Sequence, residues 1–229
     1  MKARILARIL ALCAAFAALP ALAQLDRISN QDAVSGLKAA LEKGSGVAVA
    51  ALGRTDGFFG NPRVKIPLPE SIRSAEKIMR SVGMGKYADE LILTMNRAAE
   101  AAVPEAKALF IDAVKKMSVQ DAKGVLTGGN TAGTEYFRRA TSEQLRAKFL
   151  PIVQNATKKV NLAAKYNQYA EKGARFGLLK KEDANLDSYV TQKALDGLFF
   201  MVAEEEKKIR ENPVQAGSNI LRKVFGALK

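Results

Sequence analysis

The stretch LDSYVTQKALDGLFFMVAEEEKKIRENP, from Leu186 to Pro213, decides the fold. Polar residues at its start, Asp187 or Ser188, can cap a helix. Its end is set by Asn212, because a residue that precedes proline disfavours the α region. Between these signals about 25 residues predict a helix of roughly 37 Å.

One face of this predicted helix is apolar. On a helical wheel centred on Leu198, the following residues lie within about 80° of the centre: Val190, Ala194, Leu195, Met201, Val202 and Ile209. Gly197 is unfavourable inside a helix, so we expect another helix to cross closely there. The helix should therefore be the one around which the others pack.

Glu205 lies inside that apolar face on the wheel. An unpaired buried charge is too costly, so this carboxylate must be paired, protonated or at the mouth of a cavity. A structural ion pair, or a helix end that reaches water, is one interpretation. A carboxylate that handles a ligand or a proton is the other, which makes Glu205 a candidate binding residue.

The first 23 residues have the pattern of a secretory signal peptide. Lys2, Arg4 and Arg8 precede the apolar run 9–19, and Ala21-Leu22-Ala23 is a small-residue cleavage site. We predict cleavage after Ala23, a periplasmic location, and a single helical domain over 24–229. No later stretch is long and apolar enough to span a bilayer.

Cleavage would remove Cys13, the single cysteine, from a chain that has no histidine and no tryptophan. These absences exclude Ser-His-Asp and Cys-His catalysis, thiol redox chemistry, and zinc sites built from imidazole or thiolate. No spaced acidic loop for a hard cation is found. We therefore expect no cofactor and no metal, and we favour a non-enzymatic function while an enzyme that relies on carboxylates stays open.

The chain is strongly basic. Its formal net charge is +13, and it falls to +10 once Lys2, Arg4 and Arg8 are removed. In an exported protein this favours an anionic partner such as a lipid headgroup or another anionic amphiphile, a phosphorylated glycan, or an acidic envelope protein, beside the alternative of a plain solvated surface. Nucleic acid is not expected, because the charge is spread along the chain.

The remaining sequence predicts an all-α, single compact multi-helix bundle with one extended segment. Apolar periodicity predicts helices near 29–43, 70–82, 87–103, 105–117, 118–126, 145–169 and after Pro213. Capping boxes are expected at Ser29, Ser118 and Thr141. The Gly/Pro-rich segment 53–69 cannot be regular helix; its residues 64–68 should be extended, as an edge strand or otherwise, with Phe58 and Phe59 folded onto the core or exposed to a partner.

Four further residues are candidates for binding. Asn96 and Glu100 are one helical turn apart and could present side chains jointly, or form a solvated edge. The glycine-rich turn 127–134 could hold an anion on its backbone amides with Arg138 assisting, or be an ordinary turn between helices. Tyr136, on the same helix start, could assist chemistry at a nearby carboxylate.

Three segments together resemble a known family: GFFGNPRVKIPLPES (57–71), MNRAAEAAVPEAKALFIDAVKKMSVQDAKGVLTGG (95–129) and YVTQKALDGLFFMVAEEEKKIRENP (189–213). The chain is similar to the bacterial exported family known as domain of unknown function four-one-nine-seven. The resemblance implies a helical exported protein of gram-negative type, with no known activity and no catalytic residue to transfer.

Three functions are compatible with these patterns. The first is a non-enzymatic carrier that holds an apolar or anionic amphiphile between helices rich in Ala, Leu and Met, in a cavity of about 300–1,000 Å³; a tightly filled interior would count strongly against it. The second is an envelope scaffold or chaperone-like interaction protein. The third is a glycan-acting enzyme that uses two of the carboxylates Glu100, Glu105, Glu135 and Glu205 in one cleft. We rank the carrier first and the enzyme last.

Overall fold

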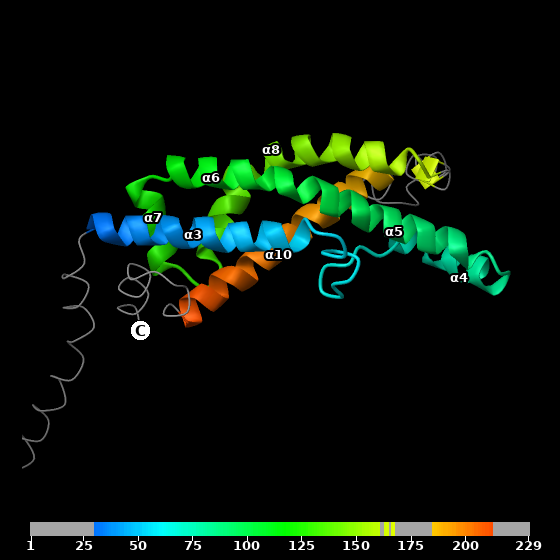
Figure 1. Ribbon diagram of the computed structural model, residues 1–229, viewed down its shortest axis with the longest axis horizontal. Helices are drawn as coiled ribbons and strands as arrows, with labels where there is room; N and C mark the ends of the chain where they lie inside the picture. Colours follow the sequence, from blue (N-terminus) through cyan, green and yellow to red (C-terminus); the bar gives the residue numbers. More distant parts are fainter. Residues whose placement is uncertain (1–29, 161–162, 165, 168–184, 213–229) are drawn as a thin grey trace, which may run out of the picture.

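The predicted central helix is α10, Leu186–Glu211, in the computed structural model. Its cap is Asn185, whose side-chain oxygen accepts a hydrogen bond from the Ser188 N–H at 3.0 Å, so the cap lies before Asp187 and Ser188. Helix α10 packs on α8, α3 and α5, and it runs diagonally across the bundle (Figure 1). The prediction that other helices pack around this stretch is confirmed.

The structure describes residues 30–160, 163–164, 166–167 and 185–212, and no residue in these ranges lies in a β-strand. The elements that precede α10 are α3 (Asn30–Leu52), η1 (Glu70–Ile72), α4 (Arg73–Ser81), α5 (Gly85–Ala102), η2 (Val103–Glu105), α6 (Ala106–Lys116), α7 (Val119–Thr127) and α8 (Ala132–Thr157). The all-α prediction is therefore confirmed. Helices α5, α6 and α8 lie roughly along the long axis of the bundle (Figure 1).

Some expected helix boundaries differ from the structure. The helix expected to end near residue 43 continues to Leu52 as α3. The capping box at Ser118 is present, with the Asp121 N–H donating to the Ser118 hydroxyl at 3.1 Å. The capping box expected at Thr141 is wrong, because Thr141 lies inside α8 and its hydroxyl donates to the Phe137 carbonyl one turn earlier. The helix expected to start at residue 145 is instead part of α8, which begins at Ala132, continues through Pro151 and ends at Thr157.

The core is built from aromatic rings and small residues. Phe110 lies between Phe137 and Phe199, with ring centroids 4.6 and 6.2 Å apart, so α6, α8 and α10 meet at one point. Helix α5 contributes three fully buried alanines to the core: Ala98, Ala99 and Ala102. Their small side chains allow the neighbouring helices to approach α5 closely. Pro104 lies in η2, the 3-10 turn that separates α5 from α6.

The segment 53–69 contains no helix, as predicted, and it forms no strand. It folds onto the core, and Phe58 is fully buried. A Cβ added to Gly197 would lie 2.7 Å from the Phe58 ring. The close approach expected at Gly197 is therefore made by this segment, and the prediction of a crossing helix there is wrong.

Some expectations fall outside the described residues. They are the signal peptide over 1–23, the capping box at Ser29 and the helix after Pro213. Among the helices that are described, none combines the length and the apolar character needed to cross a bilayer.

Candidate functional site

A buried carboxylate occupies the amino-terminal end of α8. Glu206 of α10 is 7% exposed. Its carboxylate accepts hydrogen bonds from the Gly133 N–H at 2.9 Å, and from the Thr134 N–H and hydroxyl at 2.8 Å each. The first N–H groups of a helix have no partner within it and carry partial positive charge, so they stabilise the anion.

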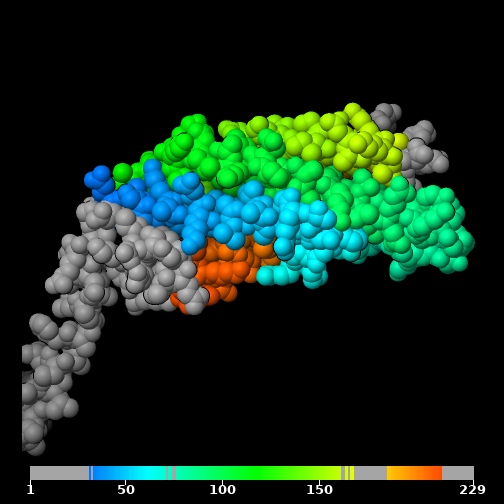
Figure 2. Space-filling model, in the orientation of Figure 1, coloured from blue at the N-terminus to red at the C-terminus, as the bar shows by residue number. Residues whose placement is uncertain are grey.

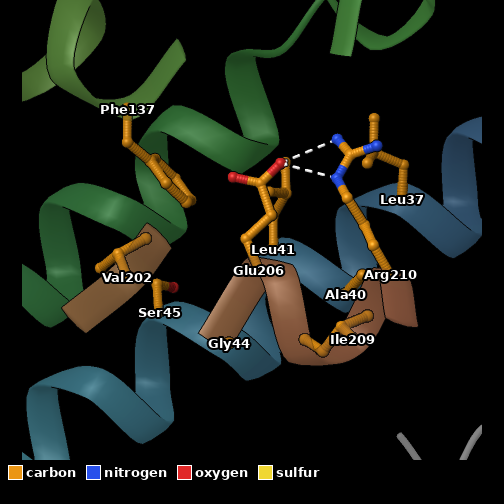
Figure 3. A pocket seen from close by; sticks show the side chains of 10 residues that line it. All are labelled: Leu37, Ala40, Leu41, Gly44, Ser45, Phe137, Val202, Glu206, Ile209 and Arg210. Atoms are coloured by element: carbon orange, nitrogen blue, oxygen red, sulfur yellow. Dashed lines mark hydrogen bonds and ion pairs between the residues drawn. The ribbon is translucent and has the colours of Figure 1, made fainter. Parts of the chain in front are cut away.

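Arg210, one turn after Glu206, completes this arrangement. Its Nε and Nη2 donate to Glu206 Oε1 at 3.0 and 2.8 Å, as Figure 3 shows. The same Nη2 donates to the Val125 carbonyl at 2.9 Å. The pair therefore joins the end of α10 to the end of α7 and the start of α8.

The sequence marked the turn 127–134 as a possible anion site, and the anion there is the protein's own Glu206. The arginine beside it is Arg210. Arg138 lies instead over the Phe199 ring, 4.6 Å from its centroid, and 3.8 Å from the Glu135 carboxylate. Sequence reasoning missed Glu206 and Arg210, although their spacing of four residues is that of a helical ion pair.

Glu205, the candidate from the wheel, does not join this group. Its side chain is 15% exposed, and its carboxylate pairs with Lys208 Nζ at 2.6 Å. Of the two interpretations of Glu205, the structure supports the structural ion pair.

Tyr136 connects two helices. Its hydroxyl donates to the Ala113 carbonyl of α6 at 2.7 Å, and the side chain is buried. Burial, with a smaller contribution from the negative charge of Asp121, raises the pKa of Tyr136 above its usual value of 10.0. The contact fixes α8 against α6.

Asn96 and Glu100 both face the segment 53–69, and both are buried. Glu100 Oε1 accepts hydrogen bonds from the Phe58 and Phe59 N–H groups at 3.0 Å each. Asn96 accepts from the Ile66 N–H at 2.8 Å and donates to the Ile66 carbonyl at 2.9 Å, as a neighbouring strand would. The two side chains act jointly, and what they hold is the protein's own backbone.

Arg97 supports Glu100 from the solvent side. It donates to Glu100 Oε2 at 2.6 Å and to Asp56 Oδ1 at 2.8 Å. These hydrogen bonds, first that to Glu100 and then that to Asp56, raise the pKa of Arg97. Together with Asn96, these residues clamp the segment 53–69 to α5.

The space beside Glu206 is small. A cavity of about 10 Å³ lies between α3 and α10. Figure 3 shows the side chains that line it, among them Leu37, Leu41, Phe137 and Val202. This volume holds about one water molecule, and an amphiphile needs far more.

A much larger hollow lies on the surface. A groove of about 700 Å³ runs along α3 beside η2 and the start of α6, which lies next to α3 in Figure 2. Small and apolar residues line it: Gly46, Val47, Val49, Ala50, Gly53, Pro104 and Ile111. The charged residues that line it are three cations and one anion: Lys43, Arg54, Lys107 and Glu42.

The groove is open and basic. A Cβ added to Gly46 would meet no atom within 4 Å, so this part of α3 faces free space. In the described part of the chain, the side chains of Arg54 and Lys107 have no ion-pair or hydrogen-bond partner. Two uncompensated cations at the edge of an apolar channel match a ligand with an anionic head and an apolar tail.

The carboxylates considered for catalysis or metal binding lie apart from the groove and the cavity. The described residues contain no group of three or more acidic, cysteine or histidine side chains that could hold a metal ion. Each candidate carboxylate has its own cation: Glu100 with Arg97, Glu105 with Lys148, Glu135 with Arg138, and Glu205 with Lys208. None of the four lines the groove or the cavity.

Comparison with known proteins gives the family. The model of the family described as "Protein of unknown function (DUF4197)" matches residues 27–226. The chain belongs to this family. Neither the curated proteins nor the solved structures contain a significant match. The family carries no assigned activity, so any function has to be argued from the residues of this chain.

Proposed function

We propose that the protein is a non-enzymatic binding protein for an amphiphile with an anionic headgroup, and that the ligand lies in the groove along α3. The observation that carries the proposal is the groove itself, about 700 Å³ in volume. This is within the size range of small-molecule sites. The apolar tail would lie on the helix α3 surface between Gly46 and Gly53.

The headgroup would lie at the Arg54 and Lys107 end of the groove. Both residues line the groove, and the single acidic lining residue, Glu42, lies about three turns before the end of α3 at Leu52, whereas Arg54 follows that end. Exposed charge pairs are each weak, so two cations should favour an anionic over a neutral headgroup by about three- to tenfold.

The location proposed for this function is the periplasm. It rests on the signal-peptide pattern over 1–23. Amino-terminal sequencing of the protein isolated from cells should find Gln24 as the first residue. An intact Met1 would remove the periplasmic part of the proposal and leave the groove unaffected.

The binding test uses two detergents with equal tails, dodecyl phosphate and dodecyl maltoside, each titrated below its micelle concentration. We expect dodecyl phosphate to bind more tightly by calorimetry. In the double variant Arg54→Gln, Lys107→Gln, its affinity should fall toward that of the maltoside. Equal binding of both detergents to the unchanged protein would contradict an anionic ligand.

The groove has a specific blocking variant. A Cβ at Gly46 would meet no atom within 4 Å, and Gly46 lines the groove, so Gly46→Phe places its ring in the groove. The matched control is Gly124→Phe on α7, because Gly124 also faces open space and lies outside the groove. We expect Gly46→Phe to abolish detergent binding and Gly124→Phe to leave it unchanged. Unchanged binding in Gly46→Phe would exclude the groove as the site.

A further inference from the structure

A second surface, formed by exposed apolar side chains within 78–93, lies outside the groove. Ile78 and Val82 are each 64% exposed, and Met84 and Tyr87 are 47% and 43% exposed. Of the eight large apolar side chains exposed in the described residues, five lie within 78–93. Single exposed apolar residues are normal in soluble proteins, but such a concentration marks an interaction surface.

These residues surround the turn between α4 and α5. Ile78 and Val82 are one helical turn apart, at the end of α4, and Met84 and Tyr87 follow directly. The Met84 N–H donates to the Met79 carbonyl at 2.8 Å, and Gly83 has a φ of 79°, so the chain reverses tightly. The turn forms one end of the elongated bundle (Figure 1, Figure 2). We call Ile78, Val82, Met84 and Tyr87 the apolar tip.

The charges around the apolar tip are unevenly compensated. Arg80 pairs with Glu76 at 2.9 Å and with Asp89 at 2.6 Å, which ties α4 to α5 and neutralises both acids. In the described residues, Lys77 and Lys86 have no acidic partner, and Lys86 Nζ lies 5.2 Å from the Tyr87 ring centroid. Glu90, an acid for which the described residues show no ion pair, lies on α5 four residues after Lys86.

We infer that the apolar tip inserts into the headgroup region of an anionic lipid bilayer. Lysines beside a shallow apolar surface attract anionic lipids, and tyrosine favours the boundary between headgroups and acyl chains. A protein partner would need a complementary surface, and a stable interface uses about 20–30 residues on each side. A convex turn with four apolar side chains cannot supply that area, whereas a bilayer needs no matching shape. This inference does not depend on the groove.

The test places an environment-sensitive fluorophore at the tip. In a Cys13→Ser background, Val82→Cys is labelled with a nitrobenzoxadiazole probe in the full chain. The matched control is Val119→Cys at the start of α7, since Val119 is also an exposed valine, at 57%, and lies outside the tip. Both proteins are mixed with vesicles of phosphatidylglycerol and phosphatidylethanolamine, and with vesicles of phosphatidylcholine.

We expect the emission at position 82 to rise and shift to the blue on anionic vesicles, with no change at position 119. On phosphatidylcholine the apparent affinity should be about 30-fold weaker, because two lysines lose their anionic partners. Equal responses at both positions, or none at position 82, would overturn the inference. A blue shift at position 82 that follows protein concentration without vesicles would also overturn it, in favour of contact with a second copy of the chain.

Discussion

The carboxylate of Glu206 lies 2.9 Å from the backbone nitrogen of Gly133, although 73 positions separate the two residues. The approach needs glycine, because a Cβ at position 133 would lie 2.4 Å from Leu41 Cδ2 and 3.0 Å from Glu206 Oε1. A glycine, a helix start and a carboxylate from another helix thus form one internal anion site. The contact fixes how α10 lies against α8.

Removing this carboxylate should destabilise the fold strongly. Glu206→Ala removes the buried carboxylate that accepts two Arg210 hydrogen bonds and the hydrogen bonds of the Gly133 and Thr134 amides. Breaking one partner of a buried ion pair costs about 3–5 kcal/mol. Urea unfolding should show a fall in unfolding free energy of about this size, and Glu206→Gln should lose less, because its amide oxygen still accepts.

The neighbouring position provides the control. Glu205 pairs with the exposed Lys208, and such surface pairs contribute about 0–1 kcal/mol. Glu205→Ala should therefore change the unfolding free energy by less than about 1 kcal/mol. If Glu205→Ala were as damaging as Glu206→Ala, the assignment of Glu206 as the buried anion would be wrong.

The sequence placed the wrong one of these two glutamates on the buried face, for a geometric reason. The buried residues Ala194, Leu198, Val202 and Glu206 follow one another at intervals of four. An ideal helix has 3.6 residues per turn, so this series moves about 40° around the helix at each step. On a wheel centred on Leu198, Glu206 therefore lies about 80° away, at the edge of the apolar face, whereas Glu205 lies near its centre. At the end of α10 the buried side has turned toward that edge, where α8 supplies the partner.

Asn96 and Glu100 should protect different parts of one segment against hydrogen exchange. In the unchanged protein, the Phe58, Phe59 and Ile66 amides should exchange slowly although they lie outside any helix. Glu100→Ala should speed exchange at Phe58 and Phe59, because both lose their acceptor. Asn96→Ala should speed exchange chiefly at Ile66. Amide exchange followed by NMR checks both.

The outcome that contradicts the clamp is equal exchange in both variants. If Asn96→Ala and Glu100→Ala each released the whole segment equally, the segment 53–69 would open as one unit, and the separate contacts would not define its stability. Exchange rates in α7, far from the segment along the chain, serve as the internal control.

Contacts between residues close in the sequence could be predicted, and contacts between distant residues could not. The capping box at Ser118 involves residues three apart, so their types alone indicate the contact. Asn96 and Glu100 were also identified as a pair one turn apart. Their targets, Ile66 and Phe58, are 30 and 42 positions away, and no periodicity reports which distant backbone a buried side chain will meet.

Two helical glycines should respond oppositely to alanine. Gly197→Ala places a Cβ 2.7 Å from the buried Phe58 ring, so overpacking should outweigh the gain in helix propensity and lower the unfolding free energy by about 1 kcal/mol or more. Gly124→Ala meets no atom within 4 Å and should raise it by about 0.5–1 kcal/mol. Thermal unfolding measures both, and a stabilised Gly197→Ala protein would show that Phe58 is loosely packed.

Tyr136 should make the fold sensitive to high pH. Burial raises its pKa in the folded chain above the value of about 10 in the unfolded chain, so above that pH the unfolded chain loses its proton first and stability falls. Tyr136→Phe should cost about 1 kcal/mol at pH 8, since the Ala113 carbonyl loses its donor. The difference between the two proteins should then shrink as the pH rises through 10, when urea unfolding is measured at each pH.

Tyr87→Phe, at a largely exposed position, should change stability little at either pH. A constant difference between Tyr136→Phe and the unchanged protein would mean that Tyr136 titrates alike in both states.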